Sequence, residues 1–380
     1  MLIINGGSSS IKFAIFDNSL KRKTGGNIER IGTKDCRLII PGNGAIKVHA
    51  KEIQEAALFL LTWLEQQNLL SNISTATHRV VQGMHYSKPQ IITSALLKQL
   101  TQFTEYDPEH LPGEIMLIKA VKKHLPYVKQ VACFDTAFHS SMPKTARLLP
   151  LPQAYYKKGI KKYGFHGLSY TYIMHSLKKV DAVYRGKGKV VIAHLGNGAS
   201  ITAVKNGKSV DTSMGFTPTG GLVMGTRTGD LDPGVAWYMM AKEKLTPAKF
   251  NKLVNRQSGL LGLSGISADM QQLLKSKNVR AAEAIDLFCY DVKKYIGAYT
   301  AVLGGIDTLV FTGGIGAHAP RIREKVCEGL QYLGINIDKK ANKQNNEIIS
   351  PAKSSIRVYV MATNEEYMMA KLTKQLLAHT

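Results

Sequence analysis

One local design occurs twice in this chain of 380 residues, about half the chain length apart. Residues 2–16 and residues 190–204 each consist of an apolar stretch, a tip of small residues, and a second apolar stretch. This pattern predicts a β-hairpin in each place. A chain that repeats one supersecondary unit is expected to fold as two related lobes. The length agrees with this expectation, because a single core rarely extends over so many residues.

The tips of both hairpins have the composition of anion-binding loops. The first tip is Asn5-Gly6-Gly7-Ser8-Ser9-Ser10, with Lys12 just beyond it, and the second is His194-Leu195-Gly196-Asn197-Gly198. Glycine has no Cβ, so backbone N–H groups can approach a ligand closely and cradle a phosphate. For either tip taken alone, an ordinary turn is the alternative interpretation.

Two further glycine-rich stretches contain candidate binding groups. Arg227 lies among glycines in residues 220–229, and its planar guanidinium suits bidentate contact with phosphate or carboxylate oxygens. Gly313-Gly314-Ile315-Gly316 lies between a predicted strand, 308–312, and a predicted helix, 320–333. A nucleoside can lie against the backbone at such a junction. A surface arginine and a common α/β turn are the alternatives.

Four polar residues occupy positions where functional groups often lie. Asp135 follows the apolar run 131–134, at the end of a strand where parallel sheets place ligand-facing residues, although a helix-capping role also fits. Arg79 ends a short strand, either on the surface or in a cleft. His166 stands between Phe and Gly, as a packed residue or as a catalyst. Glu365 fits the first turn of a closing helix, where an acid favours the helix dipole.

The composition indicates a globular protein with an unusual charge. Lys and Arg number 50 against 27 Asp and Glu, which gives a formal net charge of +23. Such a field attracts anions, and nucleic acid is one candidate partner. The basic residues are scattered in short groups, however, so we expect a generally basic surface that helps to attract small anionic substrates.

The remaining sequence features favour a soluble protein of the cytoplasm. The four cysteines are isolated and form no CxxC pair, which argues against a disulfide framework or a zinc site. The apolar run in residues 56–64 is too short to span a bilayer, and no signal-like segment opens the chain. Apolar residues at helical spacing predict a helix over 52–70 and a long core helix over 278–303.

In their order along the chain, these motifs resemble the acetate and propionate kinase family of the sugar kinase, Hsp70 and actin superfamily. The resemblance extends from Asn5 to Glu366. The matching segments are Asn5 to Phe13, His78 to Val81, Phe134 to His139, Tyr163 to Gly167, His194 to Gly198, Asp211 to Pro218, Met224 to Arg227, Phe311 to Gly316 and Thr363 to Glu366.

The resemblance implies a fold and a reaction. The fold is α/β, with two ribonuclease-H-like lobes of the actin, Hsp70 and sugar kinase type and an active-site cleft between them. We expect an N-terminal lobe over 1–140, with the helix 366–380 packed back on it, and a nucleotide-binding lobe over 141–365. The implied reaction is reversible in-line transfer of the γ-phosphoryl group of ATP to acetate, giving ADP and acetyl phosphate. It needs Mg²⁺, or Mn²⁺ in its place, and the implied assembly is a homodimer.

The resemblance also implies roles for individual residues. Arg79 and Arg227 would clamp the carboxylate and the phosphoryl oxygens, His166 would be a further donor, and Asp135 would be the active-site carboxylate. Asn5 and Glu365 would position the metal. Lys12 and residues 194–198 would contact the phosphates. The residues that would hold the nucleoside are Asp269, Met270, Gln271, Gly313, Gly314, Ile315, Gly316 and Ala317. The substrate pocket would consist of Arg79, Val81, Phe165 and Pro218.

Three positions depart from the family pattern. Glu109 stands where a leucine walls the small pocket for the substrate methyl group, and a carboxylate is costly to bury there unless it is paired or turned out. Gln271 stands in place of an arginine near the nucleoside, and Ala317-His318 replaces Glu-Asn. A preference for propionate or another short carboxylate is therefore an alternative. From other classes, the alternatives are a non-catalytic nucleotide-binding protein and a nucleic-acid-binding protein.

Overall fold

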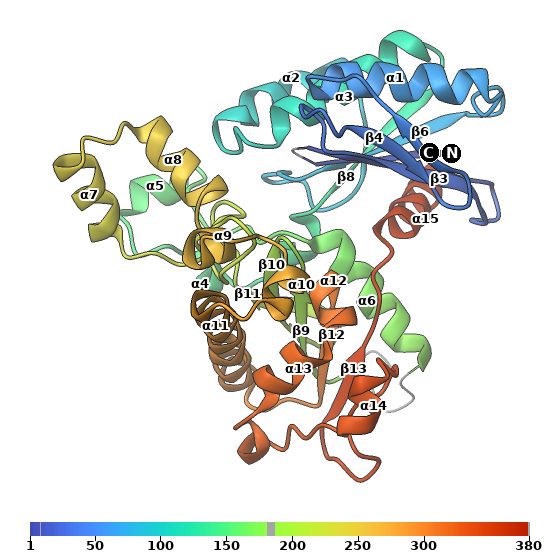
Figure 1. Cartoon of the computed structure of the whole chain (residues 1–380). Helices are drawn as coiled ribbons and strands as arrows, with labels where there is room; N and C mark the ends of the chain where they lie inside the picture. Colours follow the sequence, from blue (N-terminus) through green and yellow to red (C-terminus); the bar gives the residue numbers. More distant parts are fainter. Residues whose placement is uncertain (8, 181–186, 379–380) are drawn as a thin grey trace. The chain divides into compact units, whose positions relative to one another are not determined.

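The computed structural model describes residues 1–7, 9–180 and 187–378, in two compact units (Figure 1). Unit 1 consists of Met1–Ala137, Gly167–Ser169 and Asn364–Thr380. Unit 2 consists of Phe138–His166 and Tyr170–Thr363. The lobes expected from the sequence, 1–140 and 141–365, have similar but not identical bounds. Ser8 of the first tip and residues 379–380 of the expected last helix lie outside the described residues.

The described residues of unit 1 form an eight-stranded mixed sheet. Its strands are β1 (Leu2–Gly6), β2 (Ile11–Phe16), β3 (Arg22–Glu29), β4 (Arg37–Ile40), β5 (Gly44–Lys47), β6 (Thr75–Val80), β7 (Gln90–Ile91) and β8 (Lys129–Phe134). They lie in the order β5-β4-β3-β2-β1-β6-β8-β7. Strand β1 pairs antiparallel with β2 and parallel with β6, and β6 pairs parallel with β8. The carboxyl ends of β1, β6 and β8 therefore meet at one edge of the sheet.

Helices cover both faces of this sheet. They are α1 (Ile53–Gln66), α2 (Ser94–Gln102), α3 (Leu111–His124) and α15 (Glu365–Leu377), with a short 3₁₀ turn at Phe103–Glu105. Successive side chains of a strand point to opposite faces. In β1, Leu2 and Ile4 thus join the core under α1 and α3, whereas Ile3 packs with Met369 of α15 on the other face. Figure 1 shows α1 and α3 above the sheet and α15 below it.

Unit 2 is built around a five-stranded sheet in its described part. The strands are β9 (Lys189–Leu195), β10 (Ala199–Lys205), β11 (Lys208–Thr212), β12 (Thr308–Thr312) and β13 (Arg357–Val360), in the order β11-β10-β9-β12-β13. Helix α6 (Gly167–Val180) contributes Tyr170, Ile173 and Leu177 to a core with β9, β10 and β12. The long helix α11 (Val279–Leu303) packs against β9 and β10.

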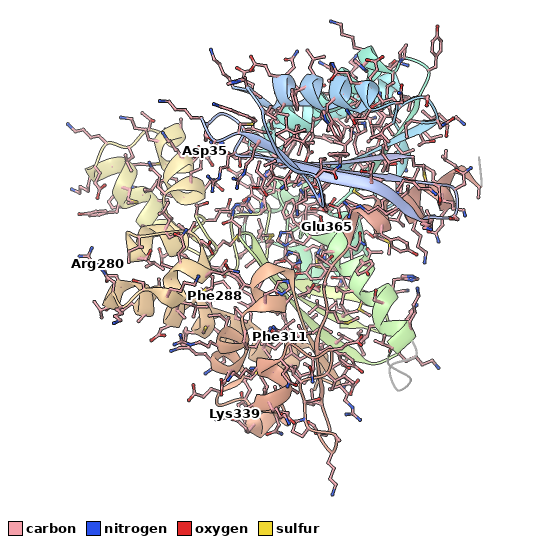
Figure 2. All side chains as sticks on the ribbon, turned by 45° about the vertical axis from the view of Figure 1, so that its right-hand side comes forward. Asp35, Arg280, Phe288, Phe311, Lys339 and Glu365 are labelled. Atoms are coloured by element: carbon pink, nitrogen blue, oxygen red, sulfur yellow. The ribbon has the colours of Figure 1, made fainter. Side chains whose placement is uncertain are left out.

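Shorter helices complete unit 2. They are α4 (Lys144–Arg147), α5 (Gln153–Lys157), α7 (Pro233–Lys242), α8 (Pro247–Arg256), α9 (Gly259–Ser264), α10 (Met270–Lys275), α12 (Gly313–His318), α13 (Pro320–Cys327) and α14 (Lys339–Lys343), with 3₁₀ turns at Ala137–Ser141 and Gln331–Leu333. In Figure 2, Phe288 of α11 and Phe311 of β12 lie inside the unit, and both are fully buried. Arg280 and Lys339 lie at its surface.

The repeat seen in the sequence is a repeat of topology. In unit 1, the antiparallel run β1-β2-β3 continues from β1 through the parallel strands β6 and β8. In unit 2, the antiparallel run β9-β10-β11 continues from β9 through the parallel strands β12 and β13. Both predicted hairpins are confirmed, with Asn5 opposite Lys12 in one and His194 opposite Ser200 in the other. Each tip thus joins the first two strands of a like-ordered sheet.

The long helix predicted over 278–303 is confirmed, and the helix predicted over 320–333 is confirmed only as far as Cys327. Helix α11 begins after Asn278, whose side chain accepts a hydrogen bond from the Arg280 N–H, and ends before the left-handed Gly304. The segment 320–333 is instead helix α13 followed by a 3₁₀ turn, because Gly329 between them has a φ of +82°. The Gly313–Gly316 stretch is itself the start of helix α12.

All four cysteines are buried and free. Cys36 and Cys133 lie in unit 1, and Cys289 and Cys327 lie in unit 2. Burial raises the pKa of the Cys133 thiol, and that of the Cys289 thiol, to about 12. A separate finding is that none of the helices described here has the length and apolar character needed to cross a membrane.

Candidate active site

Three parallel strands of unit 1 bring predicted site residues to one edge of its sheet. Asn5 is the next-to-last residue of β1, Arg79 is the next-to-last residue of β6, and Asp135 directly follows β8. The first residue of α15 is Glu365. Because these strands are parallel, their carboxyl ends form a common platform, which is where α/β sheets bind ligands.

A buried ion pair forms the centre of this group. Arg79 donates from Nη2 to Asp135 Oδ2 at 2.5 Å and from Nε to the same oxygen at 3.0 Å. It also donates from Nη1 to Asn5 Oδ1 at 3.5 Å, and Asn5 Nδ2 donates to Glu365 Oε2 at 3.0 Å. Asn5, Arg79, Asp135 and Glu365 are therefore linked by one chain of hydrogen bonds, which fixes the direction of each polar group.

The charges of this group are strongly coupled. Burial disfavours the Arg79 charge, but Asp135, Glu365 and Glu114 outweigh burial and raise the pKa of the guanidinium. Burial raises the pKa of the Glu365 carboxyl, against the opposing effects of Arg79 and Lys12. Arg79 thus stays charged over the whole physiological range, as a clamp for an anion requires.

Lys12 stands beside this group on the neighbouring strand. It is exposed on β2, directly opposite Asn5 in the strand register. Its charge lowers the pKa of Glu365, although less than burial raises it. The first tip therefore places an exposed cation next to the predicted metal-positioning residues.

The donor set suits a hard metal ion. Among residues 1–7, 9–180 and 187–378, no group of three or more His, Cys, Asp or Glu side chains is placed to hold a metal. Asp135 is fully buried, yet its Oδ1 has no hydrogen-bond partner among the described residues. Mg²⁺ commonly binds through one or two protein carboxylates together with water and substrate phosphates. The oxygens of Asn5, Glu365 and Asp135 fit that kind of site.

Two buried residues of this region were not found by sequence reasoning. Glu114 in the first turn of α3 accepts the Val81 N–H with both carboxylate oxygens, each at 3.1 Å. His78 precedes Arg79 on β6, and its Nε2 donates to Gln130 Oε1 at 2.7 Å. Burial lowers the pKa of His78 to about 4, so its imidazole is neutral at pH 7. His78 opens one of the segments that resemble the family, but the contacts of both residues join segments far apart in the sequence, which no local pattern reveals.

Unit 2 carries the second group of predicted catalytic residues. His166 lies beside Arg227 and Gly198, because a Cβ built on Gly198 would be 3.3 Å from His166 Nε2 and 3.6 Å from Arg227 Nη1. His166 stacks on His194 with ring centroids 4.3 Å apart, and its Nδ1 is 2.8 Å from Ser200 Oγ. Its φ of +59° is uncommon for a residue with a side chain and often marks a functional position.

Backbone contacts hold the glycine-rich loops of unit 2 together. Gly225 N donates to Asn197 O at 2.9 Å. Gly313 has a φ of +77°, and a Cβ on it would lie 2.5 Å from Leu195 O. Only glycine fits there, because the start of α12 lies directly against the end of β9. Arg227 itself donates from Nη1 to Pro218 O at 3.1 Å, which links it to a predicted pocket residue.

A hollow of about 370 Å³ lies next to these loops in unit 2. Seven of the predicted nucleotide residues line it: Gly196, Asn197, Asp269, Met270, Gln271, Gly314 and Ile315. The other residues that line it are Leu274, His318, Ala319, Pro320 and Arg321, which were not predicted. His194, Leu195, Gly198, Gly313, Gly316 and Ala317 do not line it. Asp269 caps helix α10 by accepting the Gln271 N–H at 2.8 Å.

The predicted substrate-pocket residues are distributed over both units. Val81 is buried in unit 1, two residues after Arg79 in the chain. Phe165 and Pro218 are buried in unit 2, where the Phe165 carbonyl accepts a hydrogen bond from His139 Nε2 at 3.0 Å. Each of them stands beside an arginine or histidine of the groups described above.

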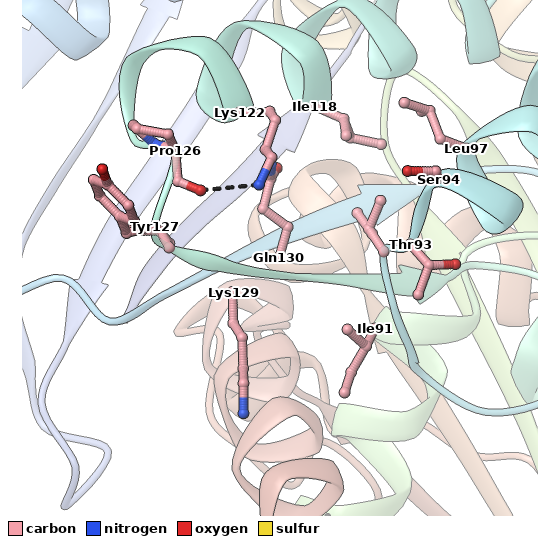
Figure 3. A pocket seen from close by; sticks show the side chains of 12 residues that line it. Ile91, Thr93, Ser94, Leu97, Ile118, Lys122, Pro126, Tyr127, Lys129 and Gln130 are labelled. Carbon is pink, nitrogen blue, oxygen red and sulfur yellow. Dashed lines mark hydrogen bonds between the residues drawn. The ribbon is translucent and has the colours of Figure 1, made fainter.

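A second hollow, of about 500 Å³, lies in unit 1, and none of the predicted site residues lines it. It is bounded by the start of β8, the segment around Tyr127 and the end of α3 (Figure 3). In this hollow Lys122 Nζ donates to the Pro126 carbonyl at 2.9 Å, as Figure 3 shows.

Comparison with known proteins identifies the family. The model of the acetokinase family matches residues 1–371. The acetate kinase of Methylocella silvestris is 41% identical over 395 residues, with 99% of this chain and 98% of the relative covered. Crystal structures of Porphyromonas gingivalis acetate kinase and of a propionate kinase from Francisella tularensis match with TM-scores of 0.89 and 0.91, each at 36% identity. The matches cover 99% and 98% of both chains, respectively.

These relationships confirm the α/β fold class expected from the sequence, that of the two-lobed actin-like kinases. They also confirm that the protein is an ATP-dependent carboxylate kinase, a phosphotransferase. From its sheet topology and these full-length relatives, we conclude that the chain belongs to the acetokinase family.

Proposed function

We propose that this protein is an acetate kinase, which transfers the γ-phosphoryl group of ATP to acetate in a reversible in-line reaction that gives acetyl phosphate and ADP. The observation that carries the proposal is the buried Arg79–Asp135 pair, hydrogen-bonded through Asn5 to Glu365. Phosphoryl transfer requires that the protein position the reactants and neutralise the negative charge that is spread over the transferred group. A rigid, permanently charged guanidinium at the end of parallel strands supplies both.

The roles of the residues follow from their chemistry. Arg79 binds the carboxylate of acetate, and Asp135 holds the guanidinium in the right direction. Arg227 and His166 bind oxygens of the phosphoryl group in transfer, and the missing side chain of Gly198 leaves room for such an oxygen beside them. Lys12 and the 194–198 tip contact the phosphates.

Asn5 and Glu365, with the Asp135 Oδ1, would hold Mg²⁺, or Mn²⁺ in its place. When bound, the ion would neutralise charge on the ATP phosphates and orient them. The protein residues have separate tasks: Asn5 directs the Glu365 carboxylate by its hydrogen bond, and Arg79 balances the negative charge of the two carboxylates.

The first experiment is ATP-dependent acyl phosphate formation, trapped with hydroxylamine, across formate, acetate, propionate and butyrate. We expect the highest kcat/KM with acetate and no product without a divalent ion. A maximum at propionate or butyrate would replace acetate by the longer acid, which is the alternative raised by Glu109 and by the propionate kinase relative. Absence of product with all four acids would contradict the proposal.

We place the nucleoside of ATP in the 370 Å³ hollow of unit 2. Gly314 lines it, and a Cβ on Gly314 would meet no atom within 4 Å. Gly314→Leu should therefore fill the hollow without straining the fold and raise the KM for ATP at least about tenfold, because the lost contacts exceed 1.4 kcal/mol. The KM for acetate and the melting temperature should change little.

Gly297→Leu is the matched control for this variant. Gly297 lies on α11, where a Cβ likewise meets no atom within 4 Å, and it lines no hollow described above. It should leave the KM for ATP within about twofold of the wild-type value. Equal KM values for ATP in Gly314→Leu and Gly297→Leu would contradict the placement of the nucleoside.

We propose further that the protein is a cytoplasmic homodimer and that α7 takes part in the dimer contact. Helix α7 buries none of its side chains within the described chain, and Trp237 and Tyr238 are 66% and 54% exposed. Exposed aromatic groups of this kind are typical of protein interfaces. The cysteines of the protein are buried and form no disulfide, which suits the reducing cytoplasm.

Light scattering after size exclusion tests the dimer. We expect twice the chain mass for the wild type and a single chain mass for Trp237→Glu, since a buried unpaired carboxylate would oppose association. Tyr127→Glu, at a residue of unit 1 that is 99% exposed, should remain dimeric. A wild-type protein of single chain mass would contradict the homodimer, and a dimeric Trp237→Glu variant would move the contact away from α7.

A further inference from the structure

The hydrogen bond between Glu114 and Val81 joins two segments that lie 33 residues apart in the sequence. Val81 directly follows β6, and Glu114 lies in the first turn of α3. Both carboxylate oxygens of Glu114 accept the Val81 N–H at 3.1 Å, and the Glu114 side chain is only 3% exposed. A backbone donor buried at this position needs an acceptor, and Glu114 supplies it.

Hydrogen bonds within residues 107–114 hold this segment together, and the Glu114 side chain joins it to the end of β6. His110 Nδ1 donates to Asp107 Oδ1 at 2.8 Å, and Leu111 N donates to Asp107 O at 3.2 Å. Glu114 N donates to His110 O at 3.1 Å. Residues 107–114 thus form one hydrogen-bonded piece, so the Glu114 side chain fixes where this piece, including Glu109, stands relative to Val81.

Apolar packing holds α3 on the sheet independently of Glu114. Leu111, Ile115 and Ile118 pack with Val80 and Phe134 in one buried cluster. Removal of the Glu114 carboxylate should therefore shift the 107–114 piece and the Val81 backbone locally, and leave the fold in place.

We propose that Glu114 is a positioning residue which, by holding the Val81 N–H, sets the acyl-chain preference of the kinase. This inference rests on the proposed function, in which Val81 contributes to the pocket for the acyl group. A small pocket distinguishes acids that differ by one methylene only if its walls are held at a fixed spacing. Glu114 fixes that spacing from outside the pocket and touches no reacting atom.

Two variants separate the hydrogen bond from the charge. Glu114→Gln and Glu114→Met both remove the carboxylate and keep the length of the side chain. Only Gln retains an oxygen that accepts the Val81 N–H. The neutral side chain of Gln should be tolerated well, since burial already raises the pKa of Glu114 well above its ordinary value.

The test measures kcat/KM for acetate, propionate and butyrate at saturating ATP in the wild type and both variants. We expect Glu114→Met to change the ratio of kcat/KM between butyrate and acetate about tenfold or more, and Glu114→Gln to stay within about threefold of the wild type. The KM for ATP should stay within about twofold in all three proteins, because the nucleoside residues lie in unit 2. A purely structural loss would lower all rates together and leave the ratio unchanged.

Hydrogen exchange gives a readout that does not depend on activity. The Val81 amide should exchange faster in Glu114→Met than in the wild type, and at the wild-type rate in Glu114→Gln. Unchanged acyl ratios in Glu114→Met, or equal changes in both variants, would overturn the inference while leaving the kinase assignment intact. A wild-type protein without activity on any carboxylate would overturn the role in acyl preference together with the proposed function, and the exchange data would then report on the Glu114–Val81 bond alone.

Discussion

Arg79→Ala is expected to lower kcat by about 10³-fold, because it removes a cation that acts on charge in the transition state. The same change should reduce the free energy of unfolding by about 3 kcal/mol or more. The reason is that Asp135 is fully buried and would lose both hydrogen bonds from the guanidinium. Turnover measured by hydroxamate formation and urea unfolding of the same preparation give the two quantities.

The double variant Arg79→Ala/Asp135→Asn separates these two effects. Removing the buried charge as well should restore a large part of the lost stability, since breaking one side of a buried pair costs more than removing both charges. Activity should remain as low as in Arg79→Ala. A kcat within tenfold of the wild type in either variant would contradict the role that we assign to Arg79.

Arg227→Ala is expected to lower kcat by about 10²- to 10³-fold, with a smaller loss of stability than Arg79→Ala. Arg227 is half-buried, and its Nη1 contacts the Pro218 carbonyl and, at 3.8 Å, the Met224 sulfur, neither of which is a buried charge. Arg79, by contrast, is paired with the fully buried Asp135 carboxylate, so its loss should cost more stability. Kinetics with acetate and ATP, together with thermal unfolding, distinguish the two arginines.

Two comparisons make this second result specific. Arg280→Ala removes an exposed arginine at the start of α11 and should leave kcat within about twofold of the wild type. Added guanidinium ion should partly restore turnover in Arg227→Ala, because it can occupy the space of the missing group. Loss of stability equal to that of Arg79→Ala would count against the local, charge-based role of Arg227.

Local patterns were enough to predict the parts of the fold that depend on nearby residues. Both hairpins, the strand at 308–312 and the helix at 278–303 have short-range signals: alternating apolar residues, a glycine-rich tip, or an Asn before a helix and a Gly after it. The helix predicted over 320–333 ends early, at Cys327, because Gly329 takes a left-handed conformation that the apolar spacing does not reveal. The roles of the predicted site residues, by contrast, still await the experiments described above.

Long-range contacts could not be predicted in the same way. From the sequence, Glu114 is an ordinary acidic residue in the first turn of a helix. Only the folded chain brings its carboxylate to the N–H of Val81, 33 positions earlier. His78 reads as a strand residue, and its neutral state follows from burial beside Gln130, 52 positions away. Five unpredicted residues of the 370 Å³ hollow, including Arg321, come from the end of α10, the end of α12 and the start of α13.

The burial of the four cysteines has a practical consequence for the study of this protein. Thiols with a raised pKa and no solvent access react with alkylating reagents only when the surrounding structure opens. Cys36 and Cys133 lie in one unit, and Cys289 and Cys327 lie in the other. The native chain thus carries its own probes of opening in each unit, and mass spectrometry after a thiol pulse can follow the two units separately without any introduced label.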